Sequence, residues 1–176
     1  MPDCKDARVV VLCEDIRHYH FVRGFLMARG VRPDRITPRI APPGSGSGEH
    51  FVREQFPLEL KAHRARRGNV VLVVCVDQDR SAQDRARKLA DACADRGVAI
   101  PAGDDRLLVL VPTRNIETWL YLIEHGAAVD ETSDYKPRCR DAKPGKLGRR
   151  LAADCPTLEL APSLENARRD WRRLCG

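Results

Sequence analysis

Three short, unbroken apolar runs constrain the fold of this chain more than any other feature. They span residues 9–13, 70–76 and 107–111 and are rich in Val and Leu. Polar and apolar residues do not alternate along them, as they would in a strand with one face in water. Short β-branched runs of this kind are typical of strands covered on both faces. We therefore predict an α/β fold with a parallel sheet flanked by helices.

Amphipathic helical patterns follow each run, as the crossover connections between parallel strands require. Their apolar faces consist of Tyr19, Val22 and Leu26; of Ala82, Ala86, Leu89, Ala90 and Cys93; and of Ile116, Trp119, Leu120 and Ile123. Each pattern stops at a glycine, at position 30, 97 or 126. A weaker strand near residues 35–41 and a polar helix over 49–67 precede the second run. The sequence thus predicts a four-stranded parallel sheet.

The length of 176 residues allows one hydrophobic core but not two independent domains. We predict a single domain over residues 1–130, with residues 131–176 as an extension packed on it. The segment YKPRCRDAKPGKLGRR, at 135–150, is expected to be a basic loop because of its Pro and Gly content. A last helix from Ser163 places Leu164, Ala167, Trp171 and Leu174 on one side, with arginines mostly on the other.

The net charge of +6 is distributed unevenly along the chain. Residues 1–135 hold 20 Lys and Arg against 20 Asp and Glu, whereas residues 136–176 hold 11 against 5. The whole excess therefore lies in the C-terminal extension. Such a basic segment can attract phosphate backbones, although solvated basic faces are also common.

The cysteine pattern and the lack of long apolar stretches indicate a cytoplasmic protein. Seven cysteines are scattered without a C-x-x-C pair, so we expect reduced thiols, with Cys13, Cys75 and Cys93 serving as packing residues. The N-terminus is polar where a signal peptide would be apolar. No apolar stretch approaches the roughly 18 residues that cross a bilayer, so no membrane contact is expected.

Acidic residues follow the predicted strands at equivalent positions. Glu14 follows the first run, Asp77 and Asp79 follow the second, and Glu117 lies in the first helical turn after the third. Ligands of open parallel sheets bind at the carboxyl ends of the strands, so these acids should converge. Adjacent carboxylates repel each other unless they share a cation. We predict that Glu14, Asp77 and Asp79 bind Mg²⁺ or Mn²⁺. The alternative is that these acids cap helices or pair with nearby arginines.

Other residues near this edge have two interpretations each. His18 and His20 could act as proton shuttles or partners of a metal ligand, or could simply pack. Arg114 could hold a scissile phosphate or form an ordinary salt bridge. The GSGSGEH segment resembles a phosphate-cradling loop but lacks the Walker lysine, which favours a flexible connector. No nucleophile elbow is present, so acyl-transfer chemistry finds no support.

Two of these motifs resemble the Toprim domain, the metal-binding module of topoisomerases, primases and OLD-family nucleases. They are LCEDIRHYHF with Glu14 and CVDQDRS with Asp77 and Asp79. A third segment, PTRNIETWLYLIEH with Glu117 and Trp119, is similar to the strand and helix of small OLD-like proteins of the RloB type. The resemblance covers about residues 7–126. It implies a nuclease or effector role in anti-phage defence, beside an ABC- or AAA-type ATPase subunit.

The sequence therefore favours a Mg²⁺- or Mn²⁺-dependent nuclease acting on DNA or, less favoured, RNA. Asp77 and Asp79 would hold the ion, Glu14 would be a further ligand or the general base, and Glu117 and Arg114 would complete the site. The alternative is a non-catalytic partner of an ATPase or of nucleic acid. In the resembling family a glycine often follows the first Glu and a second acid comes a few residues later, whereas this chain has Asp15 and then His18. A primase-like phosphotransferase is a third, less favoured alternative.

Overall fold

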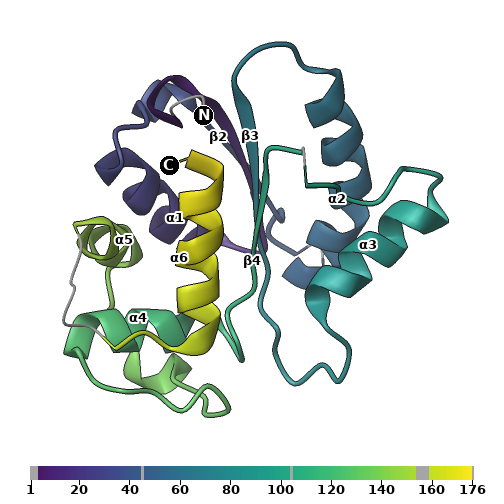
Figure 1. Ribbon diagram of the computed structural model, residues 1–176. Helices are drawn as coiled ribbons and strands as arrows, with labels where there is room; N and C mark the ends of the chain where they lie inside the picture. Colours follow the sequence, from purple (N-terminus) through teal and green to yellow (C-terminus); the bar gives the residue numbers. More distant parts are fainter. Residues whose placement is uncertain (1–3, 45, 104, 154–158, 176) are drawn as a thin grey trace.

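The computed structural model describes residues 4–44, 46–103, 105–153 and 159–175, and its centre is a four-stranded sheet. All strands are parallel and lie in the order β2-β1-β3-β4 (Figure 1). They span Arg8–Cys13 (β1), Ile36–Ile40 (β2), Val70–Cys75 (β3) and Leu107–Leu110 (β4). The predicted four-stranded parallel sheet flanked by helices is confirmed, and the weak strand near 35–41 is the edge strand β2.

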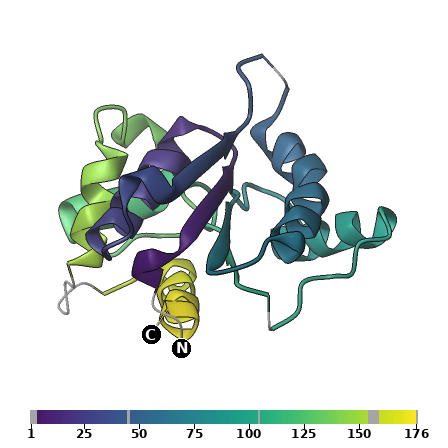
Figure 2. The ribbon, with the colours of Figure 1, turned by 90° about the horizontal axis from the view of Figure 1, so that it is seen from above.

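Helices cover both faces of the sheet, which explains the unbroken apolar runs (Figures 1 and 2). One face is lined by Val9, Val11, Cys13, Val71, Val73 and Cys75, and the other by Val10, Leu12, Leu72 and Val74. The core on the first face also includes residues of α1 (Ile16–Ala28), α4 (Ile116–His125), α5 (Pro144–Ala152) and α6 (Pro162–Cys175). The second face packs against α2 (Gly48–Ala65) and α3 (Arg85–Asp95). Alternate side chains of the central strands thus enter two separate cores.

The helix boundaries follow from capping residues. Asp15 caps α1, Ser47 caps α2 and Asp84 caps α3, each by accepting hydrogen bonds from backbone N–H groups of the first turn. Because Asp84 fixes the start of α3 at Arg85, Ala82 lies before the helix in which its spacing had placed it. At a helix C-terminus, Gly126 ends α4 by adopting the left-handed conformation, with φ 65°.

The predicted basic loop over 135–150 is wrong in part, because this segment contains helices. A short 3₁₀ helix spans Lys136–Arg138, and α5 follows at Pro144–Ala152. Pro144 occupies the first turn, where its missing N–H costs nothing. Leu147 and Leu151 are four residues apart and both enter the core beside α1. Pro144, which suggested a loop, instead begins a helix, and Gly145 and Gly148 allow that helix to approach α1 closely.

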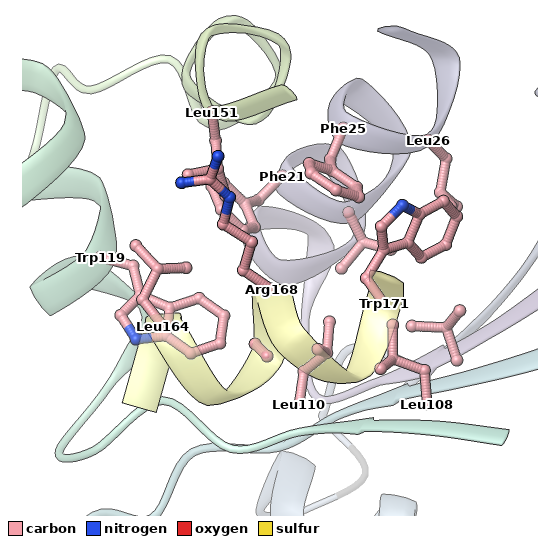
Figure 3. A pocket seen from close by; sticks show the side chains of 13 residues that line it. Phe21, Phe25, Leu26, Leu108, Leu110, Trp119, Leu151, Leu164, Arg168 and Trp171 are labelled. Carbon is pink, nitrogen blue, oxygen red and sulfur yellow. The ribbon is translucent and has the colours of Figure 1, made fainter. Parts of the chain in front are cut away.

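The C-terminal helix α6 contributes to the same core as the N-terminal elements. Leu164 and Trp171 are buried, and the Trp171 ring meets Phe25 edge-on with centroids 5.2 Å apart. Figure 3 shows side chains from α1, α4, α6 and β4 around one apolar cavity. The second tryptophan, Trp119, is fully buried and donates a hydrogen bond from Nε1 to Ser163 Oγ at 2.8 Å. Both tryptophans are packing residues, as predicted.

The expectation that all cysteines are reduced thiols is wrong for two of them. Cys4 and Cys175 form a disulfide with their Cα atoms 5.3 Å apart. The two cysteines are 171 residues apart, so no local sequence pattern predicts this disulfide. Cys13, Cys75 and Cys93 are free and buried, as predicted for packing residues. Cys155 lies outside the described residues.

No helix in the described part of the chain is both long enough and apolar enough to cross a membrane.

Candidate metal centre

The carboxyl ends of the two central strands bring Glu14, His18 and Asp77 together. Each offers one donor atom, and these atoms all lie within 4.8 Å of one another. β1 and β3 are adjacent and in register, Cys13 opposite Cys75, so the residues that follow them share one space. Glu14 Oε1 accepts a hydrogen bond from the Asp77 backbone N–H at 2.6 Å. The two acids are therefore held together by the sheet itself.

His18 is fixed at the centre of this group by two carboxylates. Its Nε2 lies 2.9 Å from Asp77 Oδ1, and its Nδ1 lies 2.8 Å from Asp15 Oδ1. The side chain is 1% exposed. Asp15 also accepts the backbone N–H groups of Arg17 and His18, so the residue that caps α1 also orients the imidazole. The sequence favoured a packing role for His18 over a role in the metal site. Its position one turn after the acidic cap Asp15 was the signal that could have indicated the second role.

The electrostatics of the centre reflect buried like charges and one compensating cation. Burial, reinforced by the charge of Asp77, raises the pKa of Glu14 to about 7. Burial alone would lower the pKa of His18, but the charge of Asp77 and the hydrogen bonds to both aspartates raise it to about 10. Partial burial opposes the ionisation of Asp15, yet its bonds with His18 and Arg17 lower its pKa to about 2. Without a metal ion, His18 is thus an imidazolium between two carboxylates.

Asp79 takes a different position from Asp77, although both belong to the D-Q-D segment. It adopts a left-handed backbone, φ 53°, and its N–H donates to the carbonyl of Arg114 at 2.8 Å. Its side chain is 47% exposed and lies 3.5 Å from Arg85 Nη2. Asp79 is not one of the three residues with mutually close donor atoms in the described part of the chain. It lies at the rim of the centre, near enough for its charge to raise the pKa of Glu14.

Glu117 lies in the first turn of α4, as predicted, and its side chain contacts α1. Its Oε1 pairs with Arg17 Nε at 3.1 Å, and Arg17 also donates to the Cys139 carbonyl at 2.7 Å. The other oxygen, Oε2, is buried and has no hydrogen-bond partner among the described residues. Burial, together with the charge of Asp77, raises the pKa of Glu117. This free oxygen is an available acceptor beside the centre.

Two arginines border the centre, and sequence reasoning identified one of them. Arg114 has a left-handed backbone, φ 69°, and its Nη2 lies 3.9 Å from Asp134 Oδ2. Arg85, which was not singled out, is buried and donates from Nε to the Asp77 carbonyl at 3.0 Å. It also pairs with Glu49 at 2.8 Å. Arg85 therefore fixes the backbone that carries Asp77.

The GSGSGEH segment ends against the centre. Ser47 caps α2, and a Cβ added to Gly48 would come within 2.6 Å of Glu14 Cβ. A glycine is needed here so that the start of α2 can approach the Glu14 side chain. His20, in contrast to His18, is exposed on the far side of α1.

The donor set fits a divalent cation. Two carboxylates and one imidazole suit a first-row metal or zinc, with the imidazole favouring Mn²⁺ over Mg²⁺. The Asp15 contact to Nδ1 is the carboxylate–histidine arrangement that commonly orients a metal-binding imidazole through its other nitrogen. A bound cation would replace the proton on Nε2 and relieve the repulsion between Glu14 and Asp77. The cluster could therefore hold a metal ion.

Comparison with models of protein families, with curated proteins and with solved structures finds no match to this chain.

Proposed function

We propose that this protein is a divalent-metal-dependent phosphodiester hydrolase that cleaves nucleic acid, with DNA as the favoured substrate. The convergence of Glu14, His18 and Asp77 at the ends of β1 and β3 carries the proposal. Mn²⁺ is the favoured ion and Mg²⁺ the alternative, because the donor set includes an imidazole. When bound, such an ion would acidify a water molecule and neutralise charge on the phosphate.

The chain's own residues would orient the metal ligands, accept a proton and position the strand. Asp15 keeps the Nδ1–H of His18 engaged, which leaves Nε2 directed at the acids. Glu14, with a pKa of about 7 in the metal-free protein, can accept a proton near neutral pH if it is not used as a ligand. Asp79, exposed at the rim, can reach a second water or the substrate side of the ion. Arg114, whose Nη2 lies 3.9 Å from Asp134 Oδ2, would hold a phosphate of the strand, and Glu117 would complete the site from its buried position.

The sequence resemblance to Toprim domains supports the same chemistry. Its acid after the first strand and its D-x-D after a later strand correspond here to Glu14 and to Asp77 with Asp79. The wider role that the resemblance implies, in anti-phage defence beside an ATPase, is part of this proposal.

The direct test is cleavage of labelled single- and double-stranded DNA and RNA with Mn²⁺, Mg²⁺ or EDTA. We expect cleavage with Mn²⁺, none with EDTA, and a rate loss of at least about 100-fold in Glu14→Gln and His18→Gln. Asp95→Asn, an exposed acid at the end of α3, is the matched control and should keep full activity. Cleavage that survives both site substitutions would reject the assignment.

A second candidate function is a non-catalytic binding partner. One observation favours it: protonated His18 already contacts both Asp15 and Asp77, so part of the acid charge is compensated without a cation. Calorimetry separates the two candidates. Folded protein that shows no heat of Mn²⁺ or Mg²⁺ binding near neutral pH, and cleaves nothing, would be this partner and not the hydrolase.

A further inference from the structure

A basic cleft lies between α1 and α5, outside the candidate metal centre. Its volume is about 390 Å³, and eight residues line it. Four of them are Lys or Arg and one is His, the rest being glycines and a proline, with no acid among them. The cationic and imidazole side chains are those of His20, Arg23, Lys143, Lys146 and Arg149.

The charge of this cleft is uncompensated within the described residues. None of its four Lys and Arg side chains forms an ion pair with another described residue. Three arginines near α2 and α3 behave differently, since Arg39, Arg64 and Arg96 pair with Glu59, Asp105 and Glu54. Desolvated or paired cations gain little from a new anion, whereas unpaired exposed ones can release counterions when they meet phosphate. The cleft is thus a surface where an anionic ligand can gain affinity.

The shape of the cleft is fixed by close helix packing. A Cβ at Gly24 would overlap the Gly145 carbonyl, and one at Gly148 would overlap the Phe21 carbonyl. The backbones of α1 and α5 therefore touch, with Arg23 on one helix and Lys146 and Arg149 on the other. The backbone positions that carry these cations are therefore fixed before a ligand arrives, which lowers part of the entropy cost of binding.

The cleft is connected to the metal centre by α1. His18 lies in the first turn of this helix, and His20 and Arg23 follow it. A rise of about 1.5 Å and a rotation of about 100° per residue place them roughly 3 Å and 8 Å further along the helix axis and on the opposite side of α1 from His18. A strand bound in the cleft would therefore reach the centre by passing around the first turn of α1.

We propose that this cleft binds the phosphate backbone of a nucleic-acid strand and leads that strand to the centre formed by Glu14, His18 and Asp77. That the strand continues to the centre rests on the proposed hydrolase function. Binding of the strand in the cleft does not depend on that function.

The test measures binding without cleavage. Fluorescence anisotropy with labelled single- and double-stranded DNA in EDTA compares the wild type with Lys146→Glu/Arg149→Glu, two exposed positions of α5. We expect a loss of affinity of about 10-fold or more at low salt, and a slope of log K against log salt concentration that is shallower by about 2. Lys61→Glu/Arg87→Glu on α2 and α3 makes the same change in net charge and is the control, with an expected loss below about 3-fold. Circular dichroism verifies folding, and the Gln substitutions at 146 and 149 replace the Glu pair if that variant unfolds.

Each outcome of these binding measurements either supports or overturns the role of the cleft. Selective loss in the α5 variant supports the cleft, even if the wild type cleaves nothing with Mn²⁺, in which case only the hydrolase proposal fails. Equal loss in both variants overturns the inference, because net charge alone then explains binding. Absence of DNA binding by the wild type also overturns it. Competition by polyglutamate as strong as that by DNA would overturn it in favour of an acidic protein partner.

Discussion

The turns after β1 and β3 both carry acids, yet they contribute to the centre in different ways. The β1 turn supplies Glu14, and through the cap of α1 it also supplies Asp15 and His18. The β3 turn supplies Asp77, and the chain then bends away from the centre. At this bend Asp79 has a left-handed backbone, and its N–H donates a hydrogen bond to the Arg114 carbonyl. Two acids separated by one residue thus differ in burial and partner. The comparison shows that a D-x-D motif does not place its two carboxylates equivalently once the strand has ended.

The largest effect should come from removing the buried acid of the β3 turn. Asp77→Asn keeps the shape of the side chain but removes the charge that faces His18 and Glu14. We expect Mn²⁺ affinity, measured by isothermal titration calorimetry, to fall by more than about 100-fold, a larger loss than for an outer partner of a ligand. Unchanged affinity in this variant would mean that the ion, if any, binds elsewhere.

A smaller loss is expected from the β1 turn when only the orientation of the imidazole is disturbed. Asp15→Asn removes the carboxylate that holds His18 Nδ1 and should weaken Mn²⁺ binding by about 10- to 100-fold. The Asn side chain can still cap α1, but the lost charge pairing with His18 should lower the thermal midpoint, so binding is measured well below the melting range of the variant. Asp34→Asn, at an exposed acid in the short 3₁₀ helix before β2, is the control. An affinity loss equal in the two variants would contradict the orienting role of Asp15.

The rim acid of the β3 turn should have a weaker effect on the ion than either of these. Asp79→Asn should lower Mn²⁺ affinity by less than about 10-fold, since its half-exposed charge acts on the centre through solvent. The cleavage rate is the sharper measurement, because a role toward a second water or the substrate would lower the rate more than the affinity. If Asp79→Asn and Asp77→Asn weaken binding equally, the two acids are equivalent ligands and the comparison fails.

Stability in metal-free buffer should depend on pH mainly through the β1 turn. The folded protein retains a proton on Glu14 up to about pH 7 and on His18 up to about pH 10, whereas the unfolded chain loses them near 4.5 and 6.5. The folded state therefore binds more protons, so stability falls as the pH rises from about 5 to about 9. Asp15 acts oppositely, with its contribution lost only as the pH falls below its unfolded value of 3.8 toward about 2.

Thermal melts in EDTA across that pH range provide the measurement. The midpoint should decrease by several degrees toward high pH in the wild type, and the decrease should be smaller in His18→Gln. A midpoint that rises with pH would contradict the protonated state of the centre.

The sequence was sufficient for the sheet because burial on both faces leaves a direct signal. Continuous runs such as 70–76 require cover on both sides, and the edge strand β2 was found despite its exposed residues. Helix α5 was missed because Pro144, Gly145 and Gly148 suggest a loop unless their partner helix is known. The Cys4–Cys175 disulfide was missed for a similar reason, since only the folded chain brings its ends together.

For the site, the sequence identified positions better than contacts. Glu14 and Asp77 could be placed together because they end strands that were expected to lie in one sheet. The part played by His18 required knowing that the first turn of α1 faces Asp77, 59 residues away. Arg85 gave no signal, because its contact is with a backbone carbonyl and not with a motif.

The glycine contact between α1 and α5 restricts how this protein can vary. Any side chain at position 24 or 148 would wedge the two helices apart and widen the row of cations that they share. Directed evolution for altered ligand preference should therefore leave these two glycines untouched and draw its diversity from the lysines and arginines around them.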